Sequence, residues 1–101
     1  MKLDPRKVAE VDRMIHEPAR LMIVTILSAV ESADFLYLQH ETGLTKGNLS
    51  SHLSKLEAAG YIEIQKTYRG KIPLTVCCLS NTGGKAFQIY RDQLKYIVEN
   101  T

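Results

Sequence analysis

The side chains in this sequence that could ligate a metal or act as nucleophiles are three histidines and two cysteines. His16, His40 and His52 show no ligand spacing, and a structural zinc site typically needs four ligands. Cys77 and Cys78 are adjacent, so on a strand they point to opposite faces and cannot easily form a disulfide with each other. We therefore expect no metal, no cofactor and two reduced thiols, as is usual in the cytoplasm.

Catalytic motifs are also missing from the sequence. It contains no Gly-rich phosphate-binding loop and no nucleophile elbow, and no histidine is paired with carboxylates at a useful spacing. The nearest such pair, His40 and Glu41, falls at the end of a predicted helix. We predict that the chain is not an enzyme.

Positive charge is concentrated in one part of the chain. Residues 45–75 contain five Lys or Arg residues and two Glu residues, although the net charge of the whole chain is only +2. The remainder carries one more acidic than basic residue. A continuous basic segment of this kind indicates a polyanionic partner, and double-stranded DNA is the partner we expect.

The first half of that segment has the pattern of a DNA-reading helix over residues 45–59. Leu49, Leu53 and Leu56 fall on one side of the helix and predict its buried face. The opposite side is small and polar, which lets a helix backbone enter a major groove about 12 Å wide. The candidate DNA contacts on this helix are Thr45, Lys46, Gly47, Asn48, Ser50, Ser51 and Lys55. The alternative is that this side is simply the solvated face of an amphipathic helix.

Several of these side chains have a defined chemical role in the DNA-reading interpretation. Asn48 can form two hydrogen bonds with adenine, and Lys55 can reach a phosphate or a guanine. The hydroxyls of Ser50 and Ser51 can donate to phosphates or base edges. Lys46 lies beside the positive end of the helix, where anions bind.

The second half of the basic segment predicts a β-hairpin over residues 61–79. YIEIQKT alternates apolar and polar residues as a half-buried strand does, and PLTVCCL is the returning strand. The tip between them, residues 68–71, contains Arg69 and Lys71, which we expect to contact the DNA backbone or the minor groove. The alternative is an ordinary basic turn.

Helices on the N-terminal side must hold these two elements in place. We predict a first helix from Pro5 to near His16, a central buried helix from Pro18, and a third helix that Gly43 ends in a left-handed conformation. A three-residue turn then leads to Thr45, the expected cap of the DNA-reading helix. This order predicts a mainly α fold with a small β-hairpin, a winged helix-turn-helix.

The last predicted helix, residues 81–99, has a broad apolar stripe. Phe87, Tyr90, Leu94 and Ile97 follow one another at helical spacing. A small domain need not bury so broad a face, which favours a homodimer whose interface the first helix completes. The predicted dimer contacts are Val8, Val11, Ile15, Phe87, Tyr90, Leu94 and Ile97. The alternative is that the stripe packs on the core of its own chain.

Taken together, these motifs resemble a known family. The stretch IHEPARLMIVTIL, then GNLSSHLSKLEAAGYI, a basic tip and LSNTGGKAF are similar to the compact winged-helix regulators of the MarR/ArsR superfamily, over roughly residues 11–87. The resemblance implies a dimeric, sequence-specific DNA-binding protein with recognition helix 45–59 and wing tip 68–71. Metal-sensing members have a Cys-x-Cys pair before the recognition helix, where this sequence reads FLYLQHETG.

We therefore predict a single winged-helix DNA-binding domain over residues 1–101, with a helix-turn-helix at about 35–59, a wing at about 61–79 and a dimerisation helix at about 81–99. The predicted function is transcriptional regulation by a homodimer on a near-palindromic site. No apolar run approaches the roughly 20 residues that cross a bilayer, so we expect a cytoplasmic protein without a membrane partner. The alternative function is a winged-helix protein–protein interaction module without DNA binding, because a net charge of +2 is modest for a DNA-binding protein.

Overall fold

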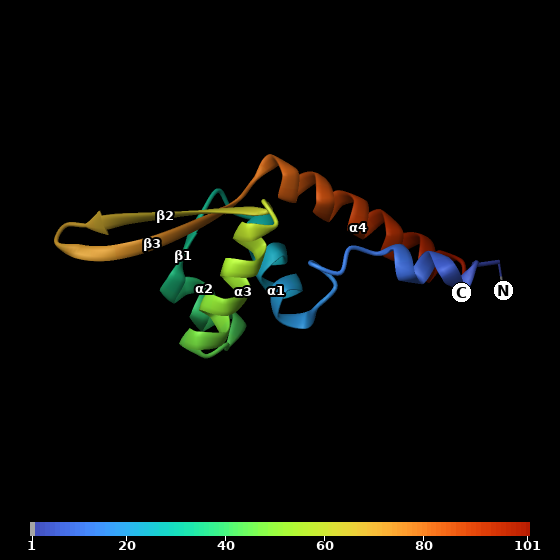
Figure 1. Ribbon diagram of the computed structural model, residues 1–101, viewed down its shortest axis with the longest axis horizontal. Coiled ribbons are helices and arrows are strands. Elements are labelled where there is room, and N and C mark those ends of the chain that lie inside the picture. Colours follow the sequence, from blue (N-terminus) through green and yellow to red (C-terminus); the bar gives the residue numbers. More distant parts are fainter. Residues whose placement is uncertain (1) are drawn as a thin grey trace.

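The computed structural model describes residues 2–101, which form four α-helices, a 3-10 helix and a three-stranded antiparallel sheet (Figure 1). The strand order is β1-β3-β2. A hairpin projects from one side of the helical body and the last helix from the other (Figure 1). This arrangement confirms the predicted winged helix. The elements are η1 (Pro5–Glu10), α1 (Pro18–Ser28), β1 (Ala33–Asp34), α2 (Phe35–Thr42), α3 (Lys46–Ala58), β2 (Ile62–Arg69), β3 (Ile72–Leu79) and α4 (Asn81–Glu99).

The main core lies between α1, α2, α3 and the inner end of the hairpin. Leu49, Leu53 and Leu56 are at most 3% exposed, which confirms the predicted buried side of α3. Burying each such leucine contributes about 1.5–3 kcal/mol, so these side chains fix how α3 is rotated about its axis. The buried core side chains are Ile23, Val24, Leu27, Ala33, Leu38, Leu49, Leu53, Leu56, Ile62 and Cys77.

The turn between α2 and α3 has the chemistry that the sequence predicts. Gly43 ends α2 with a φ of 70°, the left-handed conformation that a side chain disfavours. The Thr45 hydroxyl accepts a hydrogen bond of 3.1 Å from the backbone N–H of Asn48 and so caps α3. Leu44, between them, packs against the core. These three residues set the angle between the two helices.

The first predicted helix differs from the structure. The chain forms η1 and then turns, instead of continuing as a helix to His16. Asp12 is the cause, because its Oδ1 accepts hydrogen bonds from the backbone N–H groups of Met14 (2.8 Å) and Ile15 (3.3 Å). Side-chain bonds of this kind compete with the helical backbone bonds.

One strand of the sheet was not predicted. Ala33 and Asp34, between the second and third predicted helices, pair with Cys77 and Val76 of β3. A strand of two residues has no periodicity to detect. Asp34 also caps α2, since its Oδ1 accepts a hydrogen bond of 2.8 Å from the backbone N–H of Tyr37. This short strand therefore attaches the helix-turn-helix to the hairpin.

The two long strands pair without interruption to the end of the hairpin. Their register runs from Ile62 opposite Leu79 to Arg69 opposite Ile72, and the turn consists of residues 70–71. The strands extend further toward the tip than the sequence pattern suggested. The outer part of the hairpin therefore stands away from the helices (Figure 1).

The last helix leaves the hairpin at a tight corner. The Ser80 hydroxyl accepts a hydrogen bond of 3.0 Å from the backbone N–H of Gly83 and donates one of 2.6 Å to the Gly60 carbonyl. The Ser80 N–H donates to the Tyr61 carbonyl at 3.0 Å. Gly83 packs so closely on this carbonyl that a Cβ at position 83 would overlap it. These contacts set the direction of α4.

Among the described residues, no helix is both long and apolar enough to cross a membrane.

Candidate nucleic-acid interface

The outer face of α3 consists of small and polar side chains that the rest of the chain leaves uncovered. Apart from the Thr45 hydroxyl, none of the polar side chains predicted to contact DNA from this helix makes a hydrogen bond or ion pair within residues 2–101. Their donors and acceptors are therefore free to meet a ligand. The exposed candidates are Thr45, Lys46, Gly47, Asn48, Ser50, Ser51 and Lys55.

A groove of about 750 Å³ separates α3 from the hairpin. Lys46 from α3 and Lys66 from β2 are on opposite walls, and Glu57 is the one acidic side chain among the groove residues of the described chain. The charged side chains that line the groove therefore have a net charge of +1, which favours an anionic ligand. The residues that line it are Phe35, Leu36, Gln39, Lys46, Ser50, Leu53, Ser54, Glu57, Ile64, Lys66, Pro73, Leu74 and Thr75.

The opposite flank of α3 is attached to the segment around the start of α1. Arg20 bridges the two, because its Nη1 lies 3.2 Å from Nδ1 of His52 and its Nε donates a hydrogen bond of 2.6 Å to the Met14 carbonyl. Glu17 Oε2 lies 3.9 Å from His52 Nε2. His52 is thus half-buried in a polar contact.

The same contact perturbs the Glu17 carboxyl group. Burial acts to raise the pKa of Glu17, but the backbone N–H of Arg20, at 2.9 Å, and the charges of His52 and Arg20 outweigh burial and lower that pKa. Glu17 is therefore ionised at neutral pH beside the guanidinium of Arg20. This polar cluster holds α3 from the side away from the hairpin.

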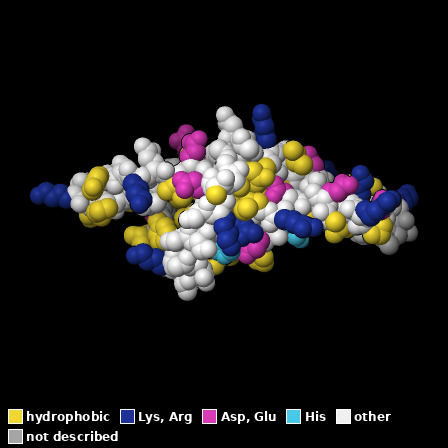
Figure 2. Space-filling view, viewed as in Figure 1, with side chains coloured by type: hydrophobic (Ala, Val, Ile, Leu, Met, Phe, Trp, Pro, Cys, Tyr) yellow, Lys and Arg dark blue, Asp and Glu magenta, His cyan; other side chains and the backbone are white. Residues whose placement is uncertain are grey.

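The end of the hairpin carries the two remaining candidates, Arg69 and Lys71. Both are exposed, and neither makes an ion pair with any other described residue. Tyr68 and Ile72, next to them, are 70% and 67% exposed. Hydrophobic and cationic side chains share this end of the molecule (Figure 2). The sequence analysis included Tyr68 in the predicted wing tip, but it named only the two cations of that tip as DNA contacts.

The two cysteines lie on β3, away from these surfaces. Cys77 is buried and Cys78 is half-buried, and both are free thiols. Burial raises the pKa of Cys77 to about 11. Burial, and the Glu63 carboxylate at 3.7 Å from its sulfur, raise the pKa of Cys78. Both thiols are therefore protonated at neutral pH. Residues 2–101 contain no group of three or more His, Cys, Asp or Glu side chains placed to hold a metal ion.

Three of the predicted dimer contacts lie inside the chain. Val11, Ile15 and Tyr90 form a small second core beneath α4 and are at most 7% exposed. The Tyr90 hydroxyl is also 2.7 Å from Nδ1 of His16. In the single chain these side chains therefore pack against one another, which is the alternative that the sequence left open for them. The physical reason is the turn at Asp12, which folds this segment under α4 instead of extending it as a helix.

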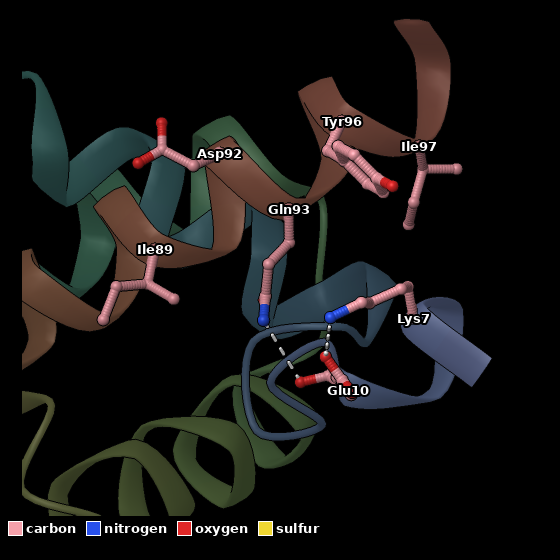
Figure 3. Close-up of a pocket in the computed structure, with 7 residues that line it drawn as sticks. All are labelled: Lys7, Glu10, Ile89, Asp92, Gln93, Tyr96 and Ile97. Carbon is pink, nitrogen blue, oxygen red and sulfur yellow. Dashed lines mark hydrogen bonds and ion pairs between the residues drawn. The ribbon is translucent and has the colours of Figure 1, made fainter. Parts of the chain in front are cut away.

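A groove of about 430 Å³ remains between η1 and α4 (Figure 3). Gln93 reaches across it and donates a hydrogen bond of 3.3 Å to the Glu10 carbonyl. Lys7 and Glu10 form an ion pair of 3.8 Å on the η1 side. Large apolar side chains around this groove are exposed. They are Ile89 and Tyr96, and Val8 of η1 is also exposed; of these three, only Val8 was among the predicted dimer contacts.

Comparison with known proteins agrees with this geometry. Residues 19–98, most of the chain, match the family described as winged helix DNA-binding domain. The chain belongs to this family. A curated relative is the uncharacterized protein MJ0432 of Methanocaldococcus jannaschii, with 32% identity over 89 residues, which cover 87% of this chain and 96% of that protein.

Two solved structures have the same fold. The transcriptional regulator homologue of Pyrococcus horikoshii OT3 superposes with a TM-score of 0.87 and 27% identity, over 93% of this chain and 95% of that chain. A MarR family regulator of Porphyromonas gingivalis W83, described as putative, gives a TM-score of 0.71 at 18% identity, over 100% of this chain and 98% of that chain. This chain therefore has the same fold as these two proteins.

Proposed function

We propose that this winged-helix protein is a homodimeric transcriptional regulator of the cytoplasm that binds double-stranded DNA in a sequence-specific manner. In this proposal α3 enters the major groove and the hairpin contacts the backbone or the minor groove. The observation that supports it best is the outer face of α3. Its polar side chains are exposed and, apart from the Thr45 hydroxyl, have no hydrogen-bond partner among the described residues, and Lys66 of the hairpin lines the adjoining groove.

The candidate residues divide between base reading and backbone contact. Asn48 points from the exposed face of α3 and pairs with adenine, and Lys55 contacts guanine or phosphate. The serines of α3 and Lys46 contact phosphates near the start of the helix. Arg69 and Lys71 contact the DNA from the hairpin.

The dimer in this proposal forms around the exposed apolar surface of α4 and η1. Ile89 and Tyr96 supply the centre of the contact, because they are at least 43% exposed and lie seven residues apart on the same side of α4. The predicted contacts Val8, Phe87, Leu94 and Ile97 complete it. A two-fold dimer presents two copies of α3 about 34 Å apart, one turn of DNA, and so favours a near-palindromic site.

The test is fluorescence anisotropy with a random-sequence duplex at about 50 and 200 mM salt. We expect binding that weakens steeply with salt, and a slope of log affinity against log salt reduced by about 2 in the double variant Arg69→Ala, Lys71→Ala. Lys85→Ala, at the start of α4, is the matched control and should leave the slope unchanged. Selection from a random library should then enrich one near-palindromic site.

Two results would contradict the proposal. No binding at low salt would favour a protein-interaction module instead of a DNA-binding protein. Binding without enrichment of any site would leave a sequence-independent DNA-binding protein and remove the base-reading role of Asn48.

A further inference from the structure

The end of the hairpin has an unusual composition for a solvated turn. Tyr68 and Ile72 are among the most exposed large apolar side chains of the described chain, at 70% and 67%. Pro73 beside them is also exposed. Exposed apolar side chains that gather at one place mark interaction sites more often than they occur by chance. We therefore expect the hairpin end to bind a partner whose surface is partly apolar.

The strand register places apolar groups on both faces of this end. Tyr68 is opposite Pro73, and Arg69 is opposite Ile72. Paired residues of antiparallel strands share a face, so one face carries an aromatic ring and a proline and the other a cation and an isoleucine. The end of the hairpin is thus a thin apolar edge with Arg69 on one side and Lys71 in the turn.

The charge of the hairpin end indicates which kind of partner it binds. Residues 65–76 contain Lys66, Arg69 and Lys71 and no acidic residue. A second copy of the same hairpin, which carries the same charges, would be repelled. A polyanion with apolar surface between its charges fits both properties, and the minor groove of DNA is lined by sugars between two rows of phosphates.

The length of the hairpin is suited to that groove. Strand β2 spans Ile62 to Arg69, so the tip lies roughly 23 Å from its root at about 3.3 Å per residue. Adjacent major and minor grooves are separated by about half a turn, roughly 17 Å. With α3 in the major groove, the hairpin end therefore reaches the neighbouring minor groove.

We propose that the hairpin end acts as an apolar wedge that bends the DNA. Tyr68 and Ile72 enter the minor groove and press against the sugars and a base step, while Arg69 and Lys71 bind the flanking phosphates. Apolar side chains inserted in this way bend a duplex by about 20–90°. This inference rests on the proposed DNA binding, and it makes part of the sequence preference depend on how easily the site is bent.

The experiment uses the full chain and the duplex enriched by selection, with donor and acceptor dyes at its two ends. Wild-type protein should raise the energy transfer between the ends, and 2-aminopurine in the minor-groove step should become brighter as the bases unstack. The double variant Tyr68→Thr, Ile72→Thr keeps strand-forming residues and all charges. It should lose most of the bend and about tenfold in affinity, with the salt slope unchanged. Val30→Thr, an exposed apolar residue outside the hairpin, is the control and should behave as wild type.

The outcomes separate this inference from the proposed function. If wild-type protein binds the selected duplex and the double variant bends it equally, the wedge is wrong and the DNA-binding function stands. If the double variant instead changes the mass of the free protein in sedimentation, the hairpin end is a protein contact and the wedge is also wrong. If wild-type protein binds no duplex, the proposed function fails and the wedge fails with it.

Discussion

Two adjacent glycines at the start of α4 give a sharp test of the structure. Gly83 and Gly84 both lie in the first turn of this helix, but only Gly83 is pressed against another element. A Cβ at Gly83 would overlap the Tyr61 carbonyl oxygen and would lie 2.8 Å from its carbon and 3.0 Å from Leu79 Cδ1. A Cβ at Gly84 would meet only Leu79 Cδ2, at an ordinary 3.9 Å.

The two alanine substitutions should therefore change stability in opposite directions. Each gains helix propensity worth up to about 1 kcal/mol. In Gly83→Ala the helix must also move away from backbone atoms, which costs roughly 1–3 kcal/mol as overpacking. This movement strains the two hydrogen bonds from Ser80 to Gly60 and Tyr61, each worth roughly 0.5–1.5 kcal/mol. We expect Gly83→Ala to lower the free energy of unfolding by about 2–4 kcal/mol, and Gly84→Ala to raise it by up to about 1 kcal/mol.

The assay is urea unfolding followed by far-UV circular dichroism. All proteins are compared at one concentration, because the stability of a dimer depends on concentration. Gly84→Ala is the matched control, since it makes the same chemical change one residue away. If Gly83→Ala proves as stable as Gly84→Ala, the close approach of α4 to Tyr61 is wrong, and so is the direction of α4.

Three further predictions concern the interface, the N-terminal segment and the dimer. Asn48→Ala should cost roughly 1–3 kcal/mol on the selected duplex in anisotropy titrations and relax its specificity, and an equal loss on random DNA would exclude base reading. The hydrogen bond to Asp12 raises the pKa of Tyr61 to about 12, above its ordinary 10.0, so its stabilisation is complete below pH 10 and is lost as pH rises from 10 to 12. Tyr61→Phe should therefore lower the free energy of unfolding by about 1 kcal/mol at pH 8. Between pH 10 and 12 this variant should lose less stability than wild type. If the difference in stability between the two proteins stays the same across this range, the contact is excluded. Ile89→Glu should separate the dimer in sedimentation without unfolding the chain, because this side chain is 59% exposed, and a wild-type mass would move the interface elsewhere.

The helix-turn-helix could be predicted from the sequence because its signals are local. A left-handed glycine, a capping threonine and leucines at helical spacing each act within a few residues, so Gly43, Thr45 and the buried face of α3 were identified correctly. Ser80 as the cap of α4 is another signal of this kind. Once the buried face of α3 is known, its exposed face follows, and the candidate DNA contacts on it need no further information.

The tertiary structure alone decided how distant segments meet. The Asp12 contacts with Met14, Ile15 and Tyr61 end the first helix early, and no local pattern reveals a partner 49 residues away. A two-residue strand such as β1 forms only because β3 lies beside it. The bridge from Arg20 to His52 likewise joins residues whose spacing in the sequence carries no signal.

The same limit applies to the predicted dimer residues. Periodicity shows that a helix face is apolar, but it does not show whether that face packs on its own chain or on another one. Tyr90 and Ile89 are neighbours on α4, yet the Tyr90 side chain is buried within its own chain and the Ile89 side chain is 59% exposed. Composition in a strand is similarly ambiguous, since Tyr68 and Ile72 have the residue types of a core. Their exposure follows only from the hairpin extending beyond the helices that would cover it.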